Sequence, residues 1–167
     1  MDFESIAFSE MSQGELKRIT ARALSCIKDP ERGIGAELFD AIITVVPQTC
    51  IEAIVVDNID KPSKILVTPR DDEHYQGLHF PGGYIRFGDN HEQTVRKVIN
   101  RELRVSVKRL KYTGVLTSGV DTRGHTLGTV FLVELDGSPS TGQWFDKVPA
   151  ELLGSHKEFL KRALGWE

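Results

Sequence analysis

The chain has 167 residues, of which 40% are hydrophobic and 27% charged. This length suits one domain with a full core, and this apolar content excludes a wholly disordered chain. The formal net charge of -3 excludes a dedicated nucleic-acid binder, which would be strongly basic, and the sequence lacks the run of roughly 20 apolar residues that a membrane span needs. The two cysteines form neither a metal-ligand spacing nor a disulfide framework, so we expect a cytoplasmic protein.

The first predicted element is an amphipathic helix from Ser12 to Ile27, in which apolar residues recur at near-helical spacing. Ser12 and Glu15 are the residue pair of a capping box, which favours a helix start at this point. A second short helix is predicted from Ala36 to about Ile43. We accordingly divide the chain into an N-terminal helical extension, residues 1–35, and a main domain, residues 36–167.

The main domain begins with two predicted strands, residues 51–56 and 64–68, which we expect to pair as a hairpin. Pro81-Gly82-Gly83 then predicts a tight turn with close backbone approach. A helix is expected over His91 to Arg104. The remaining predicted elements are strands at 105–107, 112–117 and 129–134 and one or two helices over 149–164. This order of elements predicts an α+β sandwich.

One carboxylate of the predicted 91–104 helix is unusually placed. At 100° per residue, Glu102 falls within the apolar stripe formed by Val95, Val98 and Ile99. A carboxylate on an apolar face must be paired, hydrogen-bonded or metal-bound, because burying it bare is costly. The alternative is that Glu102 lies in a fraying last turn and reaches solvent.

From Gly82 to Val105 the chain resembles the Nudix box, whose pattern is Gly, five residues, Glu, seven residues, then Arg-Glu-apolar-any-Glu-Glu-any-Gly-apolar. Gly83 matches the first glycine, Asp89 the first acid, Lys97 the arginine and Glu102 the last glutamate. The box is eroded elsewhere. Val98 and Arg101 stand in place of glutamates, and Arg104 stands in place of the final glycine. One branch of the family, GDP-mannose mannosyl hydrolase, also keeps only the last glutamate.

The resemblance covers roughly residues 50–145 and implies an α/β/α sandwich with a mixed sheet. It also implies a Mg²⁺ or Mn²⁺ ion held by Glu102 and the Gly82 carbonyl, with Asp89 supporting the loop. The predicted site residues are, for catalysis, Glu102, Asp89 and His125, and, for substrate binding, Arg70, Lys97, Arg101 and Tyr84.

Several of these residues have an ordinary alternative role. Arg70 is placed like an arginine of the mannosyl hydrolase branch, and its alternative is a loop arginine in solvent. Lys97 and Arg101 could equally form a solvated basic helix face. Tyr84 departs from that branch, which has an arginine directly after Gly-Gly. His125 is the candidate for a replacement base, although lone histidines are more often structural or face solvent.

The leading functional prediction is Mg²⁺-dependent hydrolysis of a nucleoside diphosphate derivative such as a nucleotide sugar. The rival is a catalytically inactive Nudix-fold module that binds a nucleotide, and the loss of carboxylates at Val98 and Arg101 favours it. A third reading is a protein-interaction domain whose N-terminal helix pairs two subunits in a homodimer. Fold alone does not decide among these readings.

Overall fold

The computed structural model describes residues 8–72, 75–121 and 124–166 of the chain. The helices in this part are the short 3-10 turns η2 (Phe8–Glu10) and η3 (Pro30–Arg32), and α1 (Gln13–Leu24), α2 (Ala36–Ile43), α3 (His91–Leu103) and α4 (Gly154–Leu164). The strands are β1 (Gln48–Val56), β2 (Ile65–Asp71), β3 (Gln76–His79), β4 (Gly82–Tyr84), β5 (Ser106–Asp121), β6 (Gly124–Asp136) and β7 (Gln143–Phe145).

The strands form a mixed sheet in the order β3-β2-β1-β6-β5, with β4 also pairing with β1 and β7 with β2. Strand β1 runs antiparallel to β2, as the predicted hairpin requires, and parallel to β6. Long runs of β-branched residues explain why β1 lies in the middle, since a strand covered on both faces is apolar on both. The predicted mixed sheet is confirmed.

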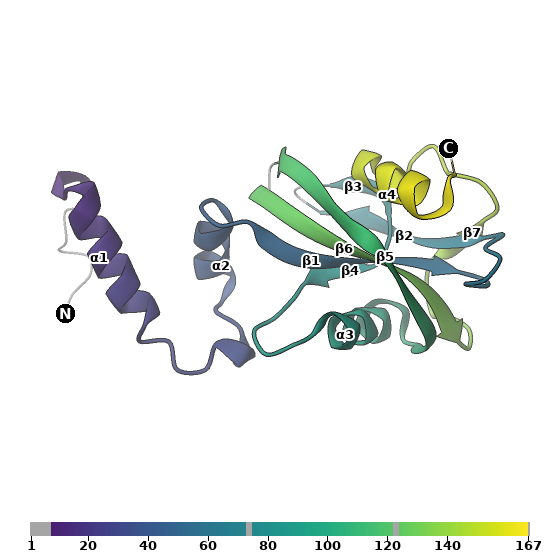
Figure 1. Ribbon diagram of the computed structural model, residues 1–167, viewed down its shortest axis with the longest axis horizontal. Helices are drawn as coiled ribbons and strands as arrows, with labels where there is room; N and C mark the ends of the chain where they lie inside the picture. The colour runs from purple at the N-terminus through teal and green to yellow at the C-terminus, as the bar shows by residue number, and fades with distance from the viewer. Residues whose placement is uncertain (1–7, 73–74, 122–123, 167) are drawn as a thin grey trace.

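Helices cover both faces of this sheet, which gives three layers (Figure 1). On one face, Ile51, Ala53 and Val55 of β1 belong to the same buried cluster as the apolar stripe of α3. On the other face, Ile54 and Val56 belong to the cluster that includes Phe159 and Leu160 of α4. Successive side chains of a strand point to opposite faces, so β1 takes part in both cores. The predicted α+β sandwich is confirmed.

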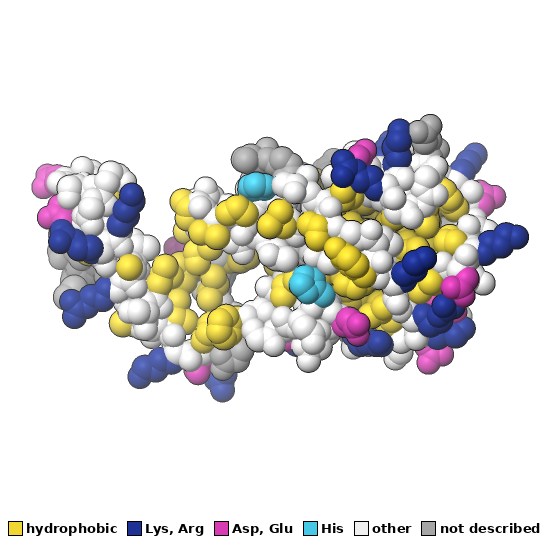
Figure 2. Space-filling model, viewed as in Figure 1, with side chains coloured by type: hydrophobic (Ala, Val, Ile, Leu, Met, Phe, Trp, Pro, Cys, Tyr) yellow, Lys and Arg dark blue, Asp and Glu magenta, His cyan; other side chains and the backbone are white. Residues whose placement is uncertain are grey.

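The predicted N-terminal helix is present as α1 and begins at the predicted capping box, in which Ser12 and Glu15 each bond to the other's backbone N–H. None of its residues is buried, and it stands away from the sandwich in Figures 1 and 2. Among the described residues, no helix is both long enough and apolar enough to cross a membrane.

Two parts of the strand prediction are wrong. Residues 105–107 and 112–117 were expected as separate strands, but both lie in or next to the single long strand β5. Polar residues interrupt the apolar pattern there because β5 pairs with β6 through register shifts, one of them between Val107 and Arg109. The expected turn at Gly82-Gly83 is instead strand β4, whose glycines pair with Glu52 and Ile51 of β1.

Candidate functional site

A cavity of about 1290 Å³ lies where the sheet, the segment from Pro30 to Asp40 and the start of α4 meet. Its lining includes Glu52 of β1, Arg70 of β2, the glycines of β4 and the end of α3. The residues that line it and that were predicted as site residues are Arg70, Gly82, Tyr84, Arg101 and Glu102. The fold thus brings together side chains from positions far apart in the sequence.

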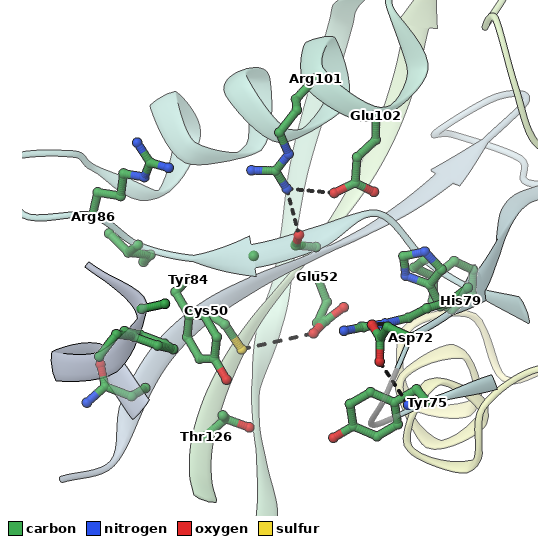
Figure 3. Close-up of a pocket in the computed structure, with 18 of the residues that line it drawn as sticks. Cys50, Glu52, Asp72, Tyr75, His79, Tyr84, Arg86, Arg101, Glu102 and Thr126 are labelled. Carbon is green, nitrogen blue, oxygen red and sulfur yellow. Dashed lines mark hydrogen bonds and ion pairs between the residues drawn. The ribbon is translucent and has the colours of Figure 1, made fainter. Parts of the chain in front are cut away.

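The predicted cation position is taken by a cationic side chain of the protein itself (Figure 3). Nη2 of Arg101 donates to Oε1 of Glu102 at 2.7 Å and to the Gly82 carbonyl oxygen at 3.3 Å. Partial burial raises the pKa of Glu102, whereas Arg101 beside it lowers that pKa. Glu102 does not fray into solvent at the helix end, because its side chain is only 22% exposed.

The backbone at the end of α3 explains one feature of the eroded box. Arg104 is the residue after the helix, and its φ of 55° places it in the left-handed region. Glycine adopts this conformation without a steric penalty, so a glycine at this point of the box has a backbone reason. Arg104 ends the helix in the left-handed conformation that a glycine would adopt there, and it does not line the cavity.

Glu52 is not among the predicted site residues, yet it lies on the wall of the cavity with its side chain 15% exposed. Burial raises the pKa of Glu52 to about 8, although Arg70 opposes this shift, and the nearby Glu102 adds to it. Glu52 therefore carries a proton at neutral pH. One signal was present in the sequence, since Glu52 is the only charged residue in an otherwise apolar central strand.

His156 of α4 packs beside Glu52, with 3.8 Å between its Nε2 and the Oε2 of Glu52. Its Nδ1 accepts a hydrogen bond from the Phe80 backbone N–H, which places the ring proton on Nε2, directed toward Glu52. Burial lowers the pKa of His156 to about 3, so this contact joins two neutral groups at pH 7. His156 gave no signal in the sequence, because it lies within an ordinary amphipathic helix.

Cationic and aromatic side chains occupy the other sides of the cavity. Arg70 pairs with Asp72 at 2.6 Å and lies over the ring of Tyr75 at 4.8 Å from its centroid. Tyr84 meets Phe39 edge-to-face, with 4.8 Å between the ring centroids. Aromatic faces suit a nucleobase, and guanidinium groups suit phosphate oxygens.

Three predicted site residues lie outside the lining of this cavity. Nζ of Lys97 binds both carboxylate oxygens of Asp89, at 2.7 and 2.8 Å, so these two side chains hold the loop before α3. That ion pair leaves neither group directed at a ligand in the cavity. His125 lies at the start of β6 and is likewise not a lining residue. The structure thus separates Asp89, Lys97 and His125 from the other predicted site residues.

Known proteins resemble the chain in sequence and in fold. The family model described as NUDIX domain matches residues 49–163. An ADP-ribose pyrophosphatase of Methanocaldococcus jannaschii is 28% identical over 127 residues, which are 69% of this chain and 75% of that protein.

Two solved structures resemble the fold. A MutT NUDIX hydrolase from Burkholderia pseudomallei has a TM-score of 0.60 at 21% identity, over 70% of this chain and 98% of that one. The NUDIX domain of Shewanella oneidensis NrtR, solved with ADP ribose, has a TM-score of 0.54 at 16% identity, over 92% and 97% of the two chains. At these identities the likeness shows the fold.

Proposed function

The chain belongs to the NUDIX domain family, and we propose that it hydrolyses a nucleoside diphosphate derivative of the ADP-ribose type. The observation that carries this proposal is the meeting of Glu102, the Gly82 carbonyl and Arg101 at a cavity that also holds Arg70. The similarity to an ADP-ribose pyrophosphatase supports the ligand class.

Hydrolases of this family generally use a divalent cation. The described residues hold no cluster of three or more His, Cys, Asp or Glu side chains for one, so the site offers one carboxylate and one backbone carbonyl. The Glu102 carboxylate and the Gly82 carbonyl supply the oxygen atoms that Mg²⁺ or Mn²⁺ prefers. A cationic group, the Arg101 guanidinium, already lies within hydrogen-bond distance of both oxygens, which shows that they converge. A bound cation would neutralise charge on the diphosphate and favour attack by water.

The protein's own side chains bind and orient the ligand. We assign Arg70 and Arg101 to the diphosphate oxygens, and the aromatic pair of Phe39 and Tyr84 to the nucleoside. In the reaction, a water oxygen bonds to one phosphorus, the bond from that phosphorus to the bridging oxygen breaks, and the water's proton passes to solvent. ADP-ribose would give AMP and ribose 5-phosphate.

A second candidate function is binding of the same ligand without hydrolysis. The position of Arg101 favours it, because a cation stands where the box has a carboxylate that would have strengthened the hold on a metal ion. The buried Val98, at 2% exposure, likewise offers no ligand atom. Nucleotide sugars remain a ligand to be tested for both functions, since they share the nucleoside diphosphate group.

The ligand class is tested by calorimetric titration of the intact chain with ADP-ribose and with GDP-mannose. Arg70→Ala should weaken binding of the preferred ligand by about tenfold or more, because a charge-assisted bond to phosphate is worth roughly 1.5–3 kcal/mol. Arg96→Ala removes the same charge outside the cavity and should leave the affinity unchanged. Equal losses in both variants would show that overall charge, and not the cavity, holds the ligand.

A further inference from the structure

The Arg101 guanidinium occupies the oxygen atoms that a metal ion would need. Its Nη2 bonds both donors that we assign to the metal ion, the Glu102 carboxylate and the Gly82 carbonyl. The guanidinium and the carboxylate together carry no net charge, so they offer a divalent cation little electrostatic attraction. A metal ion can use these donors only after the guanidinium has moved.

The hold on Arg101 is weak enough to be broken. Its side chain is 57% exposed, so water competes for its N–H groups and its ion pair with Glu102 is weakened by solvent. Its contact with the Gly82 carbonyl is long, at 3.3 Å. A single nitrogen, Nη2, makes both of these contacts, so the guanidinium is not held as a bidentate fork.

A diphosphate in the cavity would compete for the same guanidinium. Arg101 lines the cavity together with Arg70, and its N–H groups match phosphate oxygens in a planar, bidentate geometry. Phosphate oxygens are also good ligands for Mg²⁺, and the oxygen atoms of Glu102 and Gly82 lie beside the place that the guanidinium would leave.

We propose that Arg101 competes with the metal ion. In the ligand-free chain the Arg101 guanidinium occupies the two oxygen donors of the metal, and when the ligand binds it transfers to the diphosphate. This inference rests on the proposed ligand class. It deepens the proposed function, because the ligand and the cation then favour each other's binding through one side chain. Such coupling is reciprocal, so each partner changes the other's affinity by the same factor.

The test measures metal binding and ligand binding separately, without measuring activity. The first measurement is Mn²⁺ binding to the ligand-free chain, followed by electron paramagnetic resonance. Arg101→Gln should bind Mn²⁺ about tenfold more tightly than wild type, because Glu102 loses its counter-ion. Arg96→Gln is the matched control, since it removes a positive charge from the same helix, outside the cavity, at a guanidinium that donates to the Val107 backbone carbonyl and not to a carboxylate. It should bind Mn²⁺ as wild type does.

The second measurement is calorimetric titration with ADP-ribose in EDTA. Arg101→Gln should bind it about tenfold more weakly than wild type, since the diphosphate loses its guanidinium partner. Arg101→Lys keeps the charge but loses the fork, and it should retain the weak Mn²⁺ binding of the ligand-free wild type.

An unchanged Mn²⁺ affinity in folded Arg101→Gln, or an unchanged ADP-ribose affinity in EDTA, would overturn the inference. Failure of wild type to bind ADP-ribose with and without Mn²⁺ would instead count against the proposed ligand. The Mn²⁺ measurement on the ligand-free chain still decides in that case whether Arg101 blocks the metal's donors.

Discussion

Replacing Glu52 with glutamine should remove a pH dependence worth about 4 kcal/mol of unfolding free energy between pH 5 and pH 9. Burial raises the pKa of Glu52 to about 8 in the folded chain, from an ordinary value of 4.5. The folded state therefore binds this proton more tightly than the unfolded state does. The stability that the protonated group contributes is complete below pH 4.5 and is lost as the pH rises through 8.

The measurement is urea unfolding of wild type and Glu52→Gln at pH 5, 7 and 9. Other ionisable groups are shared by both chains, so the difference between their unfolding free energies isolates Glu52. The unfolding free energy of the glutamine variant, measured relative to that of wild type, should rise steadily as the pH rises. A constant difference at the three pH values would mean that Glu52 is ionised throughout.

Gly82→Ala should lower the unfolding free energy by about 1–3 kcal/mol, the range for overpacking a filled site. A Cβ at this position would lie 2.8 Å from Oε2 of Glu52 and 3.0 Å from the backbone carbonyl oxygen of Ile51. Neither atom can easily move, because Glu52 packs beside the buried His156 and Ile51 lies in the central strand.

The neighbouring glycine provides a matched control for urea unfolding. A Cβ on Gly83 would meet Cγ2 of Val98 at 3.4 Å and Nη2 of Arg101 at 3.5 Å, which are ordinary contacts. Gly83→Ala should therefore cost much less than Gly82→Ala, and an equal cost for both would show that the close approach of β4 to Glu52 is relaxed in solution.

The fold could be predicted from sequence because its signals are local. The capping box at Ser12 marks the start of α1, and the β-branched run of β1 reveals a buried strand. The sequence predicted two strands, separated by residues 108–111, where the structure has the single strand β5. The register shifts of β5 interrupt the alternation of apolar and polar residues that would have marked one continuous strand.

The candidate site could be predicted only where the box supplied the positions. Gly82, Arg101 and Glu102 were placed by their spacing, and in the structure the Arg101 guanidinium bonds the two oxygen atoms that were assigned to the metal. Glu52 and His156 are 104 positions apart, and their contact depends on how α4 packs on the sheet. Local sequence patterns carry no information on such a distant pair. The ion pair of Lys97 with Asp89 makes a different point, because here two positions of the box stabilise the loop before α3 and do not face the ligand.

Hydrolysis by this chain is tested most directly by product analysis after incubation of the intact chain with ADP-ribose and Mg²⁺. We expect AMP and ribose 5-phosphate, formed about 100-fold or more slowly by Glu102→Gln, since removing one such electrostatic contributor typically costs this much. With GDP-mannose, free sugar plus nucleoside diphosphate would indicate attack at carbon, and nucleoside monophosphate attack at phosphorus. Survival of both compounds in the presence of Mg²⁺ or Mn²⁺, with binding intact, would contradict the claim and leave a ligand-binding module.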